Sequence, residues 1–371
     1  MKKLLTLLIA GSLVTESAFA CTDVNIQAND GSVIAGRTME WAMDMGWQLQ
    51  YVPKGTVFPI TAPSSVKLPT INVTSKYSFA GVSTADVKNS FTDGQNEKGL
   101  SVSANFLPGF TQYESVSATD KNYMSILQAV EFILASYSTV DEVKQNFPSY
   151  KVWSEPIAGI GFEPTLHFLI TDKSGKSIVI EFIKGQMVVF DDSIGVMTNA
   201  PNYNWHLINL RNYLNLDNTG TFARKMTAPG TNDEKAAGIT SLGQGSGGFG
   251  LPGDYTSPSR FVRIAYLKHY AKPTKNADEA VQQVAHILNN VDIPNGSVAD
   301  SNGNHVLDEV TQWIIIKDLK NNQMYLADYA HRTNYAQIDL NQVFKSTKPM
   351  SVKVSDINYP SAKLANPFNS K

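Results

Sequence analysis

Pairs of short strand-like runs, each pair joined by a tight turn, recur along this chain of 371 residues. The runs at 24–29 and 33–37 flank Asn29-Asp30-Gly31, which is typical of a hairpin turn. Further strand-like runs lie at 166–171 with 177–183, at 186–190 with 194–198, and at 313–318 with 324–329. Helical periodicity appears in separate blocks, at 122–136, 139–145, 258–269 and 277–289. This separation favours antiparallel sheets layered with helices over alternating βαβ units.

Residues 1–20 have the three parts of a secretory signal peptide. Lys2 and Lys3 precede an apolar core, and Ala18-Phe19-Ala20 forms a small-x-small cleavage site. The apolar core is too short to span a bilayer, and no later segment has the roughly 20 apolar residues required. We therefore expect residues 21–371 to form a single exported domain, soluble in the periplasm or secreted, with no transmembrane segment.

The composition excludes several classes of function. Without residues 1–20 the net charge is near −3, which gives no reason to expect a nucleic acid or an anionic membrane as partner. The six histidines show no HExxH spacing and there is no cysteine pair, so we expect no metal site. Gly243, Gly245 and Gly248 match G-x-G-x-x-G, but no strand precedes them, and we interpret the segment as a loop.

Cys21 is the only cysteine of the chain. Cleavage after Ala20 would place its thiol and a free α-amino group on the same residue. The pKa of a free thiol is about 8.5 and that of an α-amine about 7.7–8.0, so the amine can accept the thiol proton near neutral pH. Two alternatives are an acylated lipid anchor and an inert thiol. Ala18 and Phe19 fit ordinary cleavage better than a lipoprotein signal.

Arg37 and Glu40 follow Cys21 beyond one hairpin turn. A two-strand hairpin brings its second strand back beside the first, so we expect both side chains near the chain start. A cation there would favour thiolate, and a carboxylate would orient the amine. Taken alone, either residue is typical of a solvated surface charge.

Several motifs together resemble the choloylglycine hydrolase family, which contains bile salt hydrolases and penicillin V acylases of the N-terminal-nucleophile superfamily. The resemblance runs over nearly all of residues 21–329. It rests on the start C-T-D-V, on G-R-T-M-E-W at 36–41, N-E-K-G-L at 96–100, A-N-F-L-P-G at 104–109, V-M-T-N-A-P at 196–201, L-P-G-D at 251–254 and S-P-S-R-F-V-R at 257–263.

The resemblance implies a role for each matching residue. Cys21 would be the nucleophile, with Arg37 and Arg260 near the sulfur. Asn199 would give a side-chain amide to the oxyanion hole, and Asn105 a second donor, its backbone N–H. Many members carry Asp where this chain has Glu40, so an orienting role for Glu40 requires the backbone or rotamer to adjust. His206 lies in a family-like segment, where we interpret it as structural.

The resemblance also implies an α+β fold, a four-layer αββα sandwich of two antiparallel sheets flanked by helices. The activity implied is hydrolysis of a linear amide through a thioester, with a small-molecule N-acyl amide as substrate, no cofactor and a homo-oligomer, commonly a tetramer. The signal-bearing form favours penicillin V acylase-like or N-acyl-homoserine lactone acylase activity, with conjugated bile salt hydrolysis and a non-catalytic lipid-anchored binding protein as alternatives. Trp41, Trp47 and Phe106 would line an apolar acyl pocket or belong to the core.

Overall fold

The structure is a computed structural model that describes residues 20–361 except 86, 88, 89, 158–162, 192, 220–224, 227–238, 241–246 and 302–305. Residues 1–19 of the predicted signal peptide 1–20, Gly243 and Gly245, and the residues after 361 lie outside the described residues. Gly248 lies in a turn, in agreement with a loop at this position.

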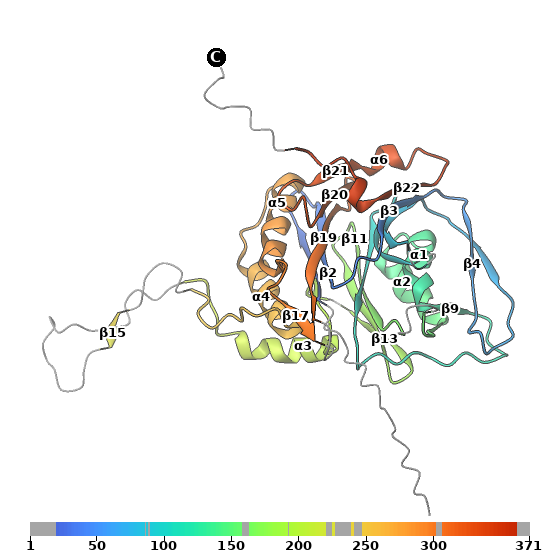
Figure 1. Cartoon of the computed structure of the whole chain (residues 1–371), viewed down its shortest axis with the longest axis horizontal. Coiled ribbons are helices and arrows are strands. Elements are labelled where there is room, and N and C mark those ends of the chain that lie inside the picture. Colours follow the sequence, from blue (N-terminus) through green and yellow to red (C-terminus); the bar gives the residue numbers. More distant parts are fainter. Residues whose placement is uncertain are drawn as a thin grey trace, which may run out of the picture.

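Two antiparallel sheets stack face to face at the centre of the molecule (Figure 1). The first sheet has the spatial order β14 (Val196–Met197), β1 (Cys21–Gln27), β2 (Val33–Trp41), β19 (Val310–Asp318), β20 (Gln323–Asp328) and β21 (Ala336–Asp339). The second has the order β13 (Gln186–Phe190), β12 (Ser177–Ile183), β11 (Leu166–Asp172), β8 (Leu100–Phe106), β7 (Phe91–Asn96), β6 (Phe79–Thr84), β3 (Trp47–Val52) and β22 (Met350–Lys353).

Helices cover both outer faces and complete four layers (Figure 1). The first sheet is covered by α4 (Ser257–Tyr270) and α5 (Ala277–Leu288), the second by α1 (Ile126–Ser136) and α2 (Val140–Asn146). The remaining helices are α3 (Tyr203–Leu210) and the short α6 (Leu340–Val343). The predicted four-layer αββα sandwich is confirmed.

Small two-stranded pairs lie outside the main sheets. They are β4 (Val57–Ile60) with β5 (Ile71–Thr74), β9 (Tyr123–Ser125) with β10 (Lys151–Trp153), β15 (Lys225–Met226) with β16 (Ile239–Thr240), and β17 (Ala299–Ser301) with β18 (Val306–Asp308). The β9–β10 pair is parallel.

The predicted hairpins form, with two changes in detail. β1 pairs with β2, β11 with β12 and β19 with β20, as the turn signals indicate. The strand expected at 194–198 shortens to β14, which joins β1 rather than its neighbour in sequence. The helix expected at 122–136 begins only at Ile126, because residues 123–125 form β9 and the Ser125 side chain caps the helix.

The layer between the sheets carries polar groups as well as apolar ones. Side chains alternate along a strand, so in β1 Cys21 and Asp23 point to the second sheet while Val24 packs with the helices α4 and α5. The strand order therefore brings the start of β1, the end of β8 and the segment after β14 to one end of the sandwich.

Candidate active site

Cys21 begins β1 and lies opposite Met39 of β2. Its side chain is fully buried, and its sulfur faces the layer between the two sheets. Arg37 Nη2 lies 3.5 Å from Cys21 Sγ, and Met39 Sδ lies 3.7 Å from it. The hairpin therefore brings a cation to the thiol, as its spacing predicts.

Arg37 is held by backbone oxygens of the opposite sheet. Its Nη1 donates to the Thr92 carbonyl at 2.6 Å and its Nη2 to the Ala104 carbonyl at 2.7 Å. Burial raises the pKa of the Cys21 thiol, and the charge of Arg37 opposes this rise. The guanidinium is thus fixed where it favours thiolate over thiol.

The main chain of Cys21 contacts Asn199 and Arg260. Its nitrogen, a peptide N–H here because Ala20 precedes it, donates to Asn199 Oδ1 at 2.7 Å. Arg260 from α4 donates to the same Oδ1 at 2.8 Å and to the Cys21 carbonyl at 2.6 Å. Arg260 thus reaches the main chain of Cys21 rather than its sulfur. Asn199 Nδ2 donates to the Phe106 carbonyl at 2.9 Å, so Asn199 joins the two sheets.

Glu40 lies one residue beyond Met39 and therefore faces the opposite side of β2. Its carboxylate accepts from the Thr38 hydroxyl at 3.0 Å and the Thr311 hydroxyl at 2.9 Å. Burial raises the pKa of Glu40 to about 8, although the charge of Arg260 opposes this shift. The contact with the Cys21 nitrogen that we expected from Glu40 is made in this structure by Asn199.

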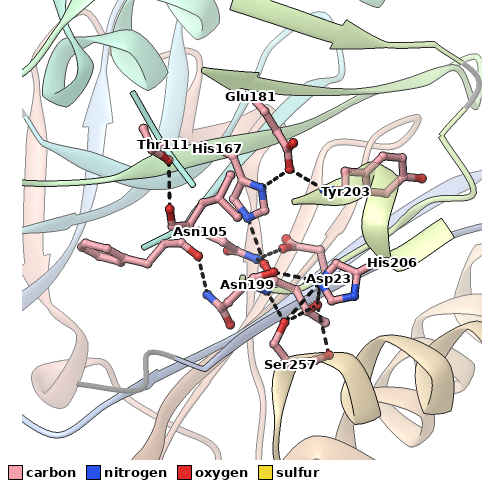
Figure 2. Close-up of polar contacts among 12 residues, drawn as sticks. Asp23, Asn105, Thr111, His167, Glu181, Asn199, Tyr203, His206 and Ser257 are labelled. Atoms are coloured by element: carbon pink, nitrogen blue, oxygen red, sulfur yellow. Dashed lines mark hydrogen bonds and ion pairs between the residues drawn. The ribbon is translucent and has the colours of Figure 1, made fainter. Parts of the chain in front are cut away.

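Asn105 uses its side chain to bridge the sheets (Figure 2). Its Nδ2 donates to Asp23 Oδ2 at 2.6 Å and to the Thr198 carbonyl at 3.1 Å. Burial raises the pKa of Asp23 to about 6, with the charge of Arg37 opposing the shift. The Asn105 side chain therefore anchors the segment before Asn199, and its backbone pairs with that of His167 between β8 and β11.

The three predicted aromatic residues line one pocket beside Arg37. Trp41 and Phe106 pack with ring centroids 4.9 Å apart, and Trp47 lies edge-on against Trp313 at 5.6 Å. The other described residues of the lining are mostly apolar: Met39, Met45, Thr84, Val87, Ser90, Thr92, Ala104, Leu127, Ile157, Pro164 and Leu166. Trp41, Trp47 and Phe106 are thus both pocket walls and core residues.

Sequence reasoning missed several polar residues that support the site. Asp23 follows Cys21 by two positions, and the strand period alone places both on one face. His167 is a single polar residue in the apolar run of β11, a pattern that indicates a buried polar contact. His206, which we interpret as structural, is buried, stacks on Phe261 and donates to the Asn199 carbonyl at 2.9 Å; burial lowers its pKa to about 4.

Within the described residues, His, Cys, Asp and Glu form no group of three or more that could hold a metal ion. The same part of the chain contains no helix with the length and hydropathy needed to cross a membrane.

Solved structures share this architecture. The conjugated bile acid hydrolase from Clostridium perfringens, in a variant form, has a TM-score of 0.76 at 29% identity, covering 90% of this chain and 96% of that one. The penicillin V acylase from Agrobacterium tumefaciens has a TM-score of 0.70 at 23% identity, a likeness of fold, covering 90% and 91% of the two chains. The fold is that of the N-terminal-nucleophile hydrolases.

The family assignment follows from sequence. Residues 21–348 match the model of the linear amide C–N hydrolases, choloylglycine hydrolase family, and the chain belongs to that family. A bile salt hydrolase/transferase of Clostridium perfringens is 31% identical, covering 90% of this chain and 98% of its own length. A penicillin V acylase of Pectobacterium atrosepticum is 25% identical, covering 91% and 85%. The chain is a linear amide C–N hydrolase.

Proposed function

We propose that this enzyme hydrolyses N-acyl amides with Cys21 as an N-terminal nucleophile, exposed by removal of residues 1–20. The observation that carries this proposal is the 3.5 Å contact of Cys21 Sγ with Arg37, a residue that also lines an apolar pocket. The match to the family model, which begins at residue 21, supports the same start of the mature chain.

Cleavage after Ala20 changes the chemistry of the Cys21 nitrogen. As a peptide N–H it cannot act as a base, whereas an α-amine with a pKa of about 7.7–8.0 can accept the thiol proton. The 2.7 Å contact with Asn199 Oδ1 would hold that amine in place. Cleavage would therefore supply the base at a nitrogen that Asn199 already contacts.

The reaction then proceeds in two steps. The Cys21 thiolate attacks the amide carbonyl carbon and forms a tetrahedral oxyanion, which accepts a hydrogen bond from Asn199 Nδ2. The C–N bond breaks, the α-ammonium gives its proton to the leaving amine, and a thioester forms. Water then cleaves the thioester and releases the carboxylic acid. Each oxyanion donor is worth about 2.7–4 kcal/mol.

The pocket lining suggests an aromatic or unbranched fatty acyl group. Trp41, Trp47, Phe106 and two methionines surround it in the described residues, and burying apolar surface there contributes about 25 cal/mol per Å². We therefore propose penicillin V acylase-like or N-acyl-homoserine lactone acylase activity. Conjugated bile salt hydrolysis is the second candidate, because relatives at 31% identity include bile salt hydrolase/transferases.

One panel of substrates tests the proposal. The mature enzyme is assayed with penicillin V, a long-chain acyl-homoserine lactone and glycocholate, and we expect kcat/KM to be highest for one of the first two. A clear preference for glycocholate would select the second candidate. If none is hydrolysed, the substrate class is wrong.

We further propose export to the periplasm or the medium, and assembly as a homotetramer. The intact mass of the exported protein tests the start of the chain: it should correspond to residues 21–371 with an unmodified Cys21. A diacylglyceryl adduct on Cys21 would instead indicate a lipid anchor and would remove the free amine. Light scattering of the purified protein tests the tetramer.

A further inference from the structure

The peptide bond before Asn199 is held by two side chains that the reaction above does not use. The Thr198 carbonyl accepts from His167 Nε2 at 3.0 Å and from Asn105 Nδ2 at 3.1 Å (Figure 2). The next N–H, that of Asn199, donates to Ser257 Oγ at 2.9 Å. Because these hydrogen bonds fix the backbone at Asn199, they also fix the position from which its side chain extends.

The hydrogen on His167 Nε2 follows from its partner. A carbonyl oxygen has no hydrogen to give, so Nε2 must carry one and donate it. The other ring nitrogen, Nδ1, lies 3.0 Å from Glu181 Oε1, and this oxygen also accepts from the Tyr203 N–H at 2.8 Å. A carboxylate that accepts from Nδ1 fixes the orientation of the ring and directs Nε2–H at Thr198.

Both members of this pair are inaccessible to water. The side chains of His167 and Glu181 are 1% and 0% exposed. A buried donor or acceptor without a partner costs about 1–3 kcal/mol, so the bonds from Glu181 through His167 to Thr198 resist rotation of either side chain. The Glu181–His167 pair therefore supports the Thr198–Asn199 backbone rigidly from β11 and β12.

We propose that His167, oriented by Glu181, is a positioning residue that sets the Asn199 side chain through the Thr198 carbonyl. The inference rests on the proposed function, in which Asn199 holds the Cys21 nitrogen and stabilises the oxyanion. His167 is on the opposite sheet from Cys21 and acts through the backbone alone. It therefore affects the rate of the chemical step rather than substrate binding.

Replacing His167 by Gln or by Asn tests the two hydrogen bonds of its ring one at a time. His167→Gln keeps an N–H at the reach of Nε2 and so keeps the bond to Thr198. His167→Asn keeps an N–H at the reach of Nδ1 and loses that bond. We expect His167→Asn to lower kcat by about 10- to 100-fold, the scale for outer hydrogen-bond partners of a site, with KM unchanged. His167→Gln should recover most of that loss.

Glu181→Gln gives an independent test if His167→Asn fails to fold. The variant keeps an oxygen for the Tyr203 N–H and for Nδ1 but loses the negative charge beside the ring, so the ring is held less firmly with Nε2 directed at the Thr198 carbonyl. We expect a fall in kcat similar to that of His167→Asn. The matched control is His331→Asn, the same substitution at a histidine that contacts Asp328 through Nδ1 at 2.8 Å on a partly exposed turn; it should leave kcat unchanged.

The assay uses the mature enzyme and its preferred substrate, with the melting temperature measured for every variant. Equal kcat values for the Asn and Gln variants of His167, or losses of kcat that follow the melting temperature alone, would overturn the positioning role. Wild-type protein that hydrolyses no linear amide would overturn the proposed function, and the inference with it.

Discussion

The outer layers of the sandwich and the layer between its sheets are built in different ways. Where α1 and α2 cover the second sheet, and α4 and α5 the first, the contacts are large apolar clusters. Between the sheets, polar side chains cross from one sheet to the other: Lys317 to Asp93, Asn105 to Asp23, and Arg37 to the carbonyls of β7 and β8.

This difference indicates that the two kinds of layer contribute differently to the stability of the fold and to the chemistry of the site. Burial of an apolar cluster stabilises the folded state in any arrangement that packs well. A buried charge is tolerated only when its partners are in place. The outer layers therefore stabilise the fold. The middle layer has an apolar cluster of its own around Trp313 and, in addition, fixes charged groups at defined distances from Cys21. Variants in the outer layers should therefore lower the unfolding free energy alone, whereas variants in the middle layer should also lower kcat.

Cys21→Ala has the largest expected effect and acts on the middle layer. It removes the proposed nucleophile, and loss of a covalent nucleophile costs about 10⁶-fold in kcat. The melting temperature should change little, since a buried Ala replaces a side chain of similar size. Steady-state turnover with a circular dichroism melt checks both expectations. Residual activity close to that of the wild type would show that another group attacks the amide.

Lys317→Met tests the charge pair between the sheets. It leaves the Asp93 carboxylate buried without its cation, which costs about 3–5 kcal/mol of unfolding free energy. Adding Asp93→Asn should restore most of this loss, because the neutral pair has no charge to compensate. Denaturant unfolding of both variants measures the difference. A Lys317→Met protein as stable as the wild type would contradict the importance of the pair.

Leu288→Ala is the matched change in an outer layer. Leu288 is fully buried in the cluster under α5, and its truncation should cost about 2–5 kcal/mol. At a temperature where both proteins are folded, kcat should equal that of the wild type, whereas Lys317→Met should lower kcat because Lys317 lies in the charge cluster with Arg37 and Asp23. Equal effects of the two substitutions on kcat would contradict the proposed difference between the layers.

Gly36→Ala probes how closely α5 approaches the first sheet. A Cβ at this position would lie 2.9 Å from Leu288 Cδ1 and still closer to Val284 Cγ1. Overpacking of this kind costs about 1–3 kcal/mol. In a Val284→Ala background the same substitution should cost less, which a double-mutant cycle of unfolding free energies measures. An equal cost in both backgrounds would place the strain elsewhere.

The raised pKa of Asp23 predicts that stability depends on pH. Its folded pKa is about 6 against an ordinary value of 3.8, so between these values the folded protein keeps a proton that the unfolded chain has lost. The contribution of Asp23 to the unfolding free energy therefore decreases as the pH rises from about 4 to about 6. Asp23→Asn should remove this decrease, and the exposed Asp356→Asn should not, in unfolding experiments across that range.

The sequence predicted much of the local structure. The hairpin turns, the helix at 277–289 and the proximity of Arg37 to Cys21 depend on residues close together in the chain, and β1 pairs with β2 as the turn signal indicates. The family motifs marked Asn105, Asn199 and Arg260, which all lie around Cys21. The predicted bounds of the elements were less accurate near β9 and β14, because these short strands form by pairing with segments distant in the sequence.

The sequence by itself indicated which groups could react: one cysteine behind a predicted cleavage site, with a cation one hairpin away. Only the tertiary structure decided what each polar group contacts. Asn199 rather than Glu40 receives the Cys21 nitrogen, and His167 reaches the backbone before Asn199. Strand periodicity predicts on which face of its sheet a side chain lies. The side chain that it contacts belongs to the other sheet, and the packing of the whole chain decides how the two sheets stack.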